Sequence, residues 1–194
     1  MKNTLKILVF LMENRGTEFT IKEISEKLSM NYRIAYEEIK ALETQKAITV
    51  KRAAGSNFCT SSYATFSALA FQAEEARKNA LLENKNIKLI YKRITEIQDP
   101  FYILLLFGSY ARKNQTKTSD IDFCLITDSS SVKERARSII EQIPLNIHLL
   151  DFTKDEFLAM IRTRKPNVGH EIAKNNVILK GVEEFYELMS YAER

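Results

Sequence analysis

The amino-acid sequence predicts a mixed α+β protein in which a small helical domain with a β-hairpin and a domain built on a mixed β-sheet are joined by a long helix. Three observations support this fold class. Helical periodicity and turn signals fill residues 1–66, glycine and proline are absent from residues 67–98, and strand and helix patterns alternate after Asp99-Pro100. We therefore expect domains at 1–66 and 100–194, with a linking helix at 67–99.

The first domain is expected to contain three short helices. Apolar residues recur at intervals of three and four in residues 4–12, and Thr20 followed three residues later by Glu23 has the form of a capping box. The third helix carries Ala35, Ile39 and Leu42 on one face. A tight turn at residues 29–31 separates the second helix from the third, which is typical of a helix-turn-helix.

A β-hairpin is predicted directly after these helices. Ile48 and Val50 alternate with polar residues, Gly55-Ser56-Asn57 gives a turn, and Phe58 and Thr60 can return as the partner strand. A helix-turn-helix followed by a hairpin is a winged helix.

The winged helix is expected to bind double-stranded DNA through the exposed face of its third helix and through its wing. Residues 1–66 contain ten Lys or Arg and seven Asp or Glu, a net charge of +3. Many winged helices instead bind proteins, and this modest charge leaves that alternative open. The residues expected to contact DNA are Tyr32, Arg33, Tyr36, Lys40, Lys51 and Arg52.

The linking helix is expected to break near residues 84–86. Its apolar stripe must be covered, either by the protein's own domains or by a second copy in a homodimer, and the sequence leaves both open. The stripe comprises Leu69, Ala73, Ala76, Ala80, Ile87, Ile90, Ile94 and Ile97.

The second domain is expected to alternate strands and helices. We predict strands at 102–107, 120–126 and 145–150, an edge strand at 176–181, a helix between the second and third strands, and a closing helix at 182–191. Thr153 and Glu156 form a second capping-box pattern, which begins a helix that reaches about Arg162.

Two aspartates in the second of these strands point to a metal site. Strand residues alternate between faces, so Asp120, Asp122 and Cys124 share the side opposite the apolar core, which we expect to be open. Carboxylates at i and i+2 lie roughly 6 to 7 Å apart. Such oxygen ligands suit Mg²⁺ or Mn²⁺, which also hold substrate phosphates.

A phosphate-binding turn is expected just before these aspartates. Gly108 follows an apolar strand and permits close approach of the backbone, Ser109 is expected to cap the next short helix, and Arg112 and Lys113 add positive charge within one turn. Together with the two aspartates, this arrangement favours a site for a nucleotide and a divalent metal ion.

The stretch LFGSYARKNQTKTSDIDFCLI resembles the signature of the DNA polymerase beta nucleotidyltransferase superfamily, and most closely its minimal nucleotidyltransferase branch. The resemblance covers about residues 100–182. It implies transfer of a nucleoside monophosphate, commonly AMP from ATP, to a hydroxyl group with the help of two metal ions. It further implies that Gly108 and Ser109 hold the triphosphate and that Asp120 and Asp122 bind the metals and are catalytic.

The same resemblance implies a third carboxylate on the strand LNIHLLD, where Asn146 occupies the acidic position. Asn supplies no negative charge and is a poor base at neutral pH. The other candidates for this third position are His148 on the same face and Asp151 from the end of the strand. Alternatively, His148 is an ordinary polar residue of the strand and Asp151 an ordinary residue before the next helix.

Two hypotheses for function follow. The first is a metal-dependent nucleotidyltransferase, with ATP or another nucleoside triphosphate as donor and a protein or nucleic-acid hydroxyl as acceptor, coupled to a DNA-binding module. Relatives of the minimal branch often act beside a toxin partner, which suggests an antitoxin-like role. The second, motivated by Asn146, is a transcriptional regulator with a catalytically degenerate, nucleotide-sensing domain.

The remaining features indicate a cytoplasmic protein. Cys59 and Cys124 fit no metal-ligand spacing and are expected to be buried thiols in a reducing compartment. The apolar run from Ile7 to Met12 is too short for a signal peptide, and no segment is long enough to span a membrane.

Overall fold

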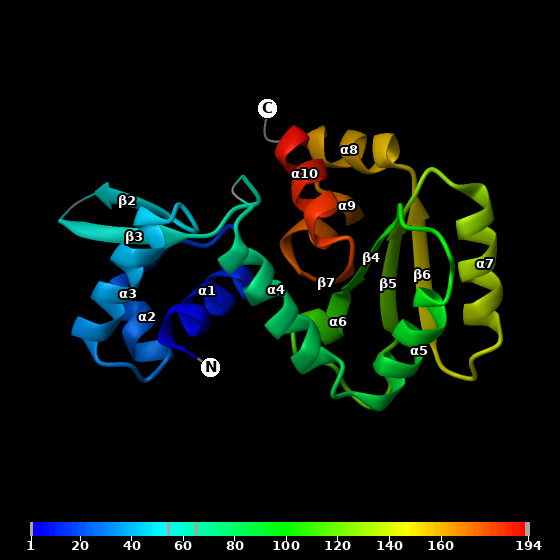
Figure 1. The fold of residues 1–194 in the computed structure, drawn as a ribbon, viewed down its shortest axis with the longest axis horizontal. Helices are drawn as coiled ribbons and strands as arrows, with labels where there is room; N and C mark the ends of the chain where they lie inside the picture. The colour runs from blue at the N-terminus through cyan, green and yellow to red at the C-terminus, as the bar shows by residue number, and fades with distance from the viewer. Residues whose placement is uncertain (1, 54, 65, 193–194) are drawn as a thin grey trace. The chain divides into compact units, whose positions relative to one another are not determined.

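The computed structural model describes residues 2–53, 55–64 and 66–192. The chain divides into two compact units, Met1–Ala76 and Arg77–Arg194, and the division falls within helix α4 (Ala68–Leu81). The first unit combines helices with a small antiparallel sheet, and the second packs helices around a four-stranded mixed sheet (Figure 1). The predicted mixed α+β class is confirmed.

The first unit is a helix-turn-helix with a wing. Its elements are α1 (Asn3–Glu13), β1 (Phe19–Thr20), α2 (Ile21–Lys27), α3 (Tyr32–Thr44), β2 (Thr49–Ala53) and β3 (Ser56–Thr60). The capping box at the start of α2 is present, with Glu23 N bonded to Thr20 Oγ1 at 3.2 Å and Thr20 N to the Glu23 carboxylate at 2.7 Å. The third helix buries Ala35, Ile39 and Leu42, as its periodicity predicted.

Two helices of this unit end in the same way, with a non-glycine residue in the left-handed region. Ser29 after α2 has φ +48° and Lys46 after α3 has φ +55°. In each case the next amide reaches back five residues, Met30 N to Ser25 O at 2.8 Å and Ala47 N to Leu42 O at 2.9 Å. This is the Schellman pattern, which satisfies the last carbonyl groups of a helix and turns the chain sharply.

The wing is the predicted hairpin of β2 and β3, with Val50 opposite Cys59. The structure adds a third strand, because β1 pairs antiparallel with β3 and places Phe19 opposite Cys59. This two-residue strand is too short to show periodicity in the sequence.

The second unit contains the rest of α4 and all later elements. They are α5 (Lys85–Thr95), β4 (Ile103–Phe107), α6 (Gly108–Ala111), β5 (Ile121–Ile126), α7 (Ser130–Glu141), β6 (Ile147–Phe152), α8 (Lys154–Arg162), α9 (Val168–Lys174), β7 (Asn176–Lys180) and α10 (Val182–Ala192). The predicted break near residues 84–86 is present, because the Asn84 side chain accepts hydrogen bonds from the first amides of α5.

The sheet of this unit has the strand order β6-β5-β4-β7. Strand β4 pairs antiparallel with β5 and with β7, whereas β5 and β6 are parallel and are joined through α7. The segment 176–181 is therefore an edge strand, as predicted. Strand β6 begins two residues later than expected, so that Leu145 and Asn146 lie just before it.

One face of the sheet packs under α5 and α7 (Figure 1). Leu104, Leu106, Phe123 and Leu125 alternate along β4 and β5 and are buried in this cluster. The same cluster contains the C-terminal half of the linking stripe, which is covered by the unit's own core and not by a second copy; these residues are Ile87, Ile90, Ile94 and Ile97.

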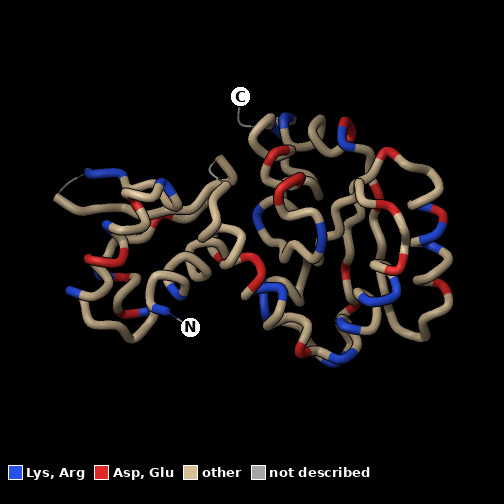
Figure 2. Tube along the Cα trace, in the orientation of Figure 1, with Lys and Arg blue, Asp and Glu red and all other residues tan. Residues whose placement is uncertain are grey.

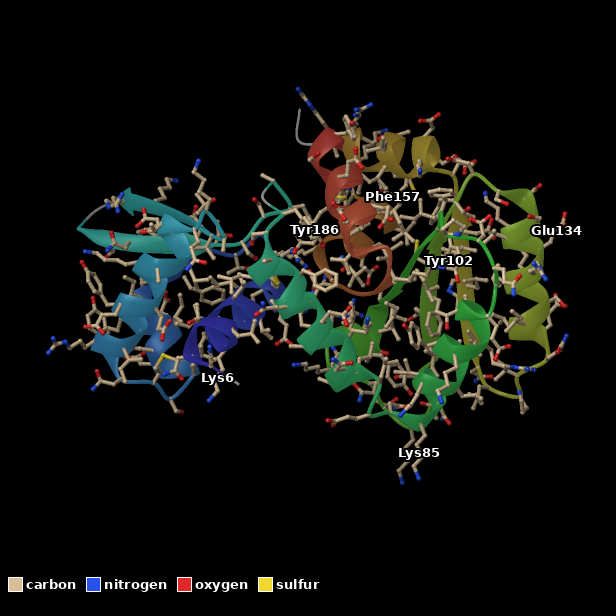
Figure 3. All side chains as sticks on the ribbon, viewed as in Figure 1. Lys6, Lys85, Tyr102, Glu134, Phe157 and Tyr186 are labelled. Atoms are coloured by element: carbon tan, nitrogen blue, oxygen red, sulfur yellow. The ribbon has the colours of Figure 1, made fainter. Side chains whose placement is uncertain are left out.

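Side chains on the opposite face of the sheet are also buried, so the expectation that this face is open is wrong. Leu105, Cys124 and Ile178 lie side by side across three strands and are fully buried. Phe157 of α8 and Phe185 of α10 lie in contact at 6.0 Å between ring centroids within this second layer. Figure 3 shows Tyr102 and Phe157 directed inward and Lys85 and Glu134 directed away from the unit. Along β5, Asp122 is partly exposed and the other residues are buried, and Asp120 just before the strand is exposed.

Candidate functional site

The site is built where β4 ends and β5 begins, because Phe107 pairs with Asp122 across these antiparallel strands. Gly108 follows with φ +70°, and an ideal Cβ placed on it would stand 2.2 Å from Asp122 Oδ2. A side chain at position 108 would force the Asp122 carboxylate to move. The Asp122 carboxylate therefore lies against bare backbone, which is the close approach that the sequence suggested for a glycine at this position.

Helix α6 is a single turn that begins at Gly108 and ends at Ala111. Its N-cap is Phe107 and no side chain caps it, so Ser109 lies inside the turn; the expectation that Ser109 caps this helix is wrong. Lys113 with φ +58° ends the turn, and Asn114 N donates to Ser109 O at 3.1 Å in a third Schellman pattern. Backbone hydrogen bonds consequently hold Ser109 in the turn, next to Gly108.

The environment of Asp122 is short of positive charge. Burial raises the pKa of its carboxyl group above the usual value, and the nearby negative charges of Asp120 and Glu171 act in the same direction. The hydrogen bond and charge of His148 oppose this shift without overcoming it. Asp120 is exposed, whereas the Asp122 side chain retains 24% of its exposure. A cation beside the two aspartates would relieve this deficit.

The parallel pairing of β5 with β6 brings His148 directly opposite Asp122. The distance from His148 Nδ1 to Asp122 Oδ1 is 3.4 Å, and the imidazole is 58% exposed. Asn146 is exposed and is anchored by its carbonyl oxygen, which accepts from Ile121 N at 2.9 Å. Asp120, Asn146 and His148 line a hollow of about 370 Å³ together with Leu145 and Ile147.

Asp151 does not belong to this cluster. It pairs with Leu125, three register positions beyond Asp122, and shares the side of β6 occupied by Ile147 and Leu149. There its carboxylate accepts from Arg137 at 2.6 Å and lies 3.5 Å from Lys133 Nζ, both on α7. The structure thus excludes the expectation that Asp151 reaches in as the third acid, because it anchors α7 to the sheet.

Arg112, expected at the nucleotide, contacts a residue that the sequence did not single out. Its Nη1 lies 2.5 Å from Glu171 Oε1, and both side chains are about two-fifths exposed. Glu171 belongs to α9, 59 residues further along the chain, and its charge also acts on Asp122. No local pattern marks a glutamate in a short helix as part of a distant site, and only the tertiary fold brings Glu171 to Arg112.

The residues present fit a divalent metal ion shared with a nucleotide. Within residues 2–53, 55–64 and 66–192, no group of three or more Asp, Glu, His and Cys side chains is gathered closely enough to hold a metal by itself. Magnesium sites that also bind substrate commonly use one or two carboxylates plus phosphate oxygens. Asp120 and Asp122 supply that number of carboxylates beside the Gly108 turn, and Arg112 stands at the end of the same short helix.

The predicted DNA-binding residues form a surface on the first unit. Tyr32 and Arg33 are exposed at the start of α3, and Tyr32 stacks on Tyr36 with ring centroids 6.5 Å apart. Lys40 Nζ lies 4.8 Å from the centre of the Tyr36 ring. Four of the six predicted residues therefore line one side of α3.

Acidic neighbours accompany three of these six residues. Arg33 lies 3.2 Å from Glu37, Arg52 lies 3.0 Å from Glu43, and Lys51 lies 3.9 Å from Glu18. Figure 2 shows Asp and Glu positions interspersed with Lys and Arg positions along the trace of the first unit. Any DNA phosphate must therefore compete with these weak surface pairs.

The comparisons with known proteins agree with this organisation. The family described as polymerase beta, nucleotidyltransferase matches residues 85–184, just over half of the chain, and the family described as HTH domain matches residues 3–55. No curated protein matches the chain. Among solved structures, a crystal structure of a toxin-antitoxin with AMP-PNP is similar at 21% identity, with 55% of this chain and 81% of that chain covered and a TM-score of 0.37.

Among the described residues, no helix has the length and apolar character needed to cross a membrane.

Proposed function

Because the chain belongs to the polymerase beta nucleotidyltransferase family, we propose that its second unit transfers a nucleoside monophosphate, with ATP as the donor, to a hydroxyl group of a protein or nucleic acid. The observation that carries this proposal is the placement of the Asp122 carboxylate against the Gly108 backbone, with the exposed Asp120 just before the same strand. This arrangement places carboxylates that can bind a metal ion beside a turn whose glycine leaves room for a phosphate.

Each residue has a distinct role in the proposal. Asp120 and Asp122 hold the divalent ion, which neutralises phosphate charge and orients the triphosphate when bound. Gly108 and Ser109 present backbone to the phosphates, and Lys113 adds charge at the end of the turn. Arg112 exchanges its carboxylate partner Glu171 for a phosphate oxygen, a change favoured by the strength of guanidinium–phosphate hydrogen bonds.

In the proposed reaction, an acceptor hydroxyl oxygen attacks the α-phosphorus of the triphosphate. The bond from the α-phosphorus to the oxygen that bridges the α- and β-phosphates breaks, and pyrophosphate leaves with the bonding electrons. The hydroxyl proton passes to water or to a nearby base. The chain's own residues position the donor for attack, and such positioning, with stabilisation of charge, supplies most of the catalytic advantage in these transfers.

The proposal is tested by incubating the full chain with α-³²P-labelled ATP, Mg²⁺ or Mn²⁺, and a panel of RNA, DNA and protein acceptors. Incorporation of label is expected for at least one acceptor and is expected to disappear when Asp120→Ala and Asp122→Ala are combined. Asp155→Asn, an exposed acidic residue in the first turn of α8, is the matched control. Absence of incorporation with every triphosphate and acceptor contradicts the enzyme proposal.

A protein acceptor would give the enzyme an antitoxin-like role, in which it modifies a partner protein such as a toxin. The minimal branch that the sequence resembles supports this choice of acceptor. Intact-mass spectrometry of a candidate partner after incubation is expected to show the addition of one nucleoside monophosphate. An unchanged partner mass, in a reaction where nucleic acid is labelled, assigns the acceptor to nucleic acid.

We further propose that the first unit binds double-stranded DNA through α3 and the wing. The exposure of Tyr32 and Arg33 at the start of α3 supports this, because the N-terminal part of a recognition helix contacts base edges. Salt-dependent binding to a promoter fragment is expected, weakened by Arg33→Ala. Lys85→Ala, which removes one positive charge from the second unit, is the control. Equal losses of DNA affinity in the two variants would show that binding depends on the overall positive charge of the chain and not on α3.

A nucleotide-sensing regulator is the second candidate, favoured by the side chains of β6. The side that His148 shares with Asn146 carries no carboxylate, and Asp151 is engaged with α7. This candidate predicts that ATP changes the DNA affinity of the full chain without being consumed. Label incorporation, or DNA binding that ATP leaves unchanged, contradicts it.

A further inference from the structure

The β5–β6 pair places a nitrogen ligand where the proposed metal site needs its next donor. Asp122 and His148 are register partners, and Nδ1 of the imidazole lies 3.4 Å from Oδ1 of the carboxylate. The imidazole is more than half exposed and faces the hollow that Asp120 and Asn146 also line. It is therefore within reach of an ion at Asp122 and is not part of the hydrophobic core.

The other side chains of this edge compete poorly for the same place. Asn146 precedes β6, and its side-chain amide carries no charge, so its oxygen is a weaker ligand than a carboxylate or an imidazole. Asp151 is turned toward α7, where Lys133 and Arg137 hold it. Glu171 is engaged by Arg112. Of the side chains on β6, His148 is the register partner of Asp122, and its imidazole is the nitrogen donor beside that carboxylate.

We propose that His148 is a direct metal ligand, so that the site selects Mn²⁺ or a later first-row divalent ion over Mg²⁺. This inference rests on the proposed function, because it concerns the metal of that same site. Mg²⁺ takes oxygen ligands almost exclusively, whereas imidazole is a good ligand for first-row transition ions, with affinity rising from Mn²⁺ onward. The Asp122 carboxylate, the His148 imidazole and phosphate oxygens would form a mixed set of oxygen and nitrogen ligands that disfavours Mg²⁺.

The loss of a carboxylate strengthens the same preference. A site with two protein carboxylates attracts any divalent ion less through charge than a site with three, so the covalent character of the metal–nitrogen bond weighs more in the selection. Replacing His148 by aspartate is therefore expected to increase Mg²⁺ affinity more than Mn²⁺ affinity.

The test measures metal binding to the full chain in the presence of α,β-methylene-ATP, without reliance on turnover. Electron paramagnetic resonance gives the Mn²⁺ affinity, and competition by Mg²⁺ gives the ratio of the two. At least a tenfold preference for Mn²⁺ is expected. Electron spin-echo modulation of bound Mn²⁺ is expected to report a directly bound ¹⁴N nucleus. Because the chain has two histidines, this nitrogen can be assigned to one of them with a single variant at each.

Two variants make the assignment specific. In His148→Asp, the ¹⁴N modulation is expected to vanish while Mn²⁺ still binds, and the Mn²⁺ to Mg²⁺ preference is expected to fall at least threefold. In His170→Gln, the modulation is expected to persist, because His170 bonds to Ile161 O at 2.9 Å within the α8–α9 region. Circular dichroism confirms that both variants are folded.

The outcomes separate this inference from the proposed function. Mn²⁺ binding without ¹⁴N modulation, or a preference that His148→Asp leaves unchanged, overturns the role of His148 and leaves the nucleotidyltransferase proposal standing. Failure of both Mn²⁺ and Mg²⁺ to bind with the nucleotide overturns the metal site itself, and the proposed function with it.

Discussion

The Asp122 carboxylate occupies the space in which a side chain at position 108 would begin, 2.2 Å from an ideal Cβ on Gly108. The two residues are separated by fourteen positions in the sequence and are joined by the antiparallel pairing of β4 and β5. Two observations therefore favour glycine at this position: its positive φ of +70° and the room that the missing Cβ leaves for the carboxylate. The carboxylate and the turn form one structural feature.

Gly108→Ala is predicted to damage the fold and the site together. The new Cβ must displace the Asp122 carboxylate, and the alanine must adopt a left-handed backbone conformation. The expected cost is about 1–3 kcal/mol in the free energy of unfolding. Nucleotide affinity measured by calorimetry is expected to fall at least tenfold. Gly55→Ala is the matched control, since Gly55 has φ +75° with no atom within 4 Å. Equal losses of affinity in the two variants would contradict the prediction.

Glu171→Gln is predicted to tighten binding of ATP in the absence of metal. Arg112 loses its carboxylate partner and becomes available to a phosphate, and a half-exposed pair of this kind is worth up to about 1 kcal/mol, or roughly a fivefold change in affinity. Arg112→Ala is expected to weaken ATP binding. If Glu171→Gln weakens it as well, Glu171 supports the nucleotide directly and does not compete for Arg112.

Lys46→Gly is predicted to stabilise the first unit. Lys46 ends α3 with φ +55°, a conformation that costs a residue with a Cβ about 1 kcal/mol relative to glycine. Its side chain is exposed, so the substitution removes no packing. Thermal unfolding followed by circular dichroism is expected to shift upward by a few degrees. Gly16→Ala, at φ +79° in open space, is the opposite change and is expected to lower the same transition.

Both thiols are predicted to be unreactive in the folded protein. Burial, with a smaller contribution from the Glu43 charge, raises the pKa of Cys59 to about 11, and burial raises the pKa of Cys124 further. The thiolate that reacts is therefore scarce at pH 8, and the sulfur atoms are shielded. Ellman's reagent is expected to detect neither cysteine until guanidinium chloride unfolds the chain. Rapid reaction of one thiol in native buffer would show local opening around it.

Stability conferred by the α8 capping box is predicted to depend on acid pH. The Thr153 backbone N–H donates to the Glu156 carboxylate at 2.7 Å, and this hydrogen bond lowers the pKa of Glu156 below its ordinary value. The folded state therefore favours the ionised form. Its contribution is complete above the unfolded-state pKa and is lost as the pH falls through the lower folded-state pKa.

The measurement compares urea midpoints of the protein and Glu156→Gln between pH 3 and pH 7. The variant is expected to be less stable at neutral pH, and the two midpoints are expected to converge at the acid end. Asp155→Asn, in the same helical turn but outside the capping box, is expected to show a smaller pH-dependent difference. A difference that grows as the pH falls would reverse the sign and refute the assignment.

Local sequence patterns predict many of the helices and strands of the fold. The capping boxes at Thr20 and Thr153, the spacing of Ala35, Ile39 and Leu42, and the strand runs of the second unit all correspond to elements of the structure. These features depend on neighbours within about one helical turn or along one strand, so the sequence specifies them directly. Strand β1, with two residues, and the exact start of β6 escape such patterns.

Some features of the candidate site could likewise be predicted from local sequence, and others could not. The sequence by itself determined that Gly108, Ser109, Asp120 and Asp122 stand at the ends of two strands, because strand periodicity and the demands of glycine are local. Only the tertiary structure decided that His148 faces Asp122, that Asp151 serves α7, and that Glu171 reaches Arg112. Register between strands and the docking of α9 are set by packing of side chains far apart in the chain, and no local pattern contains that information.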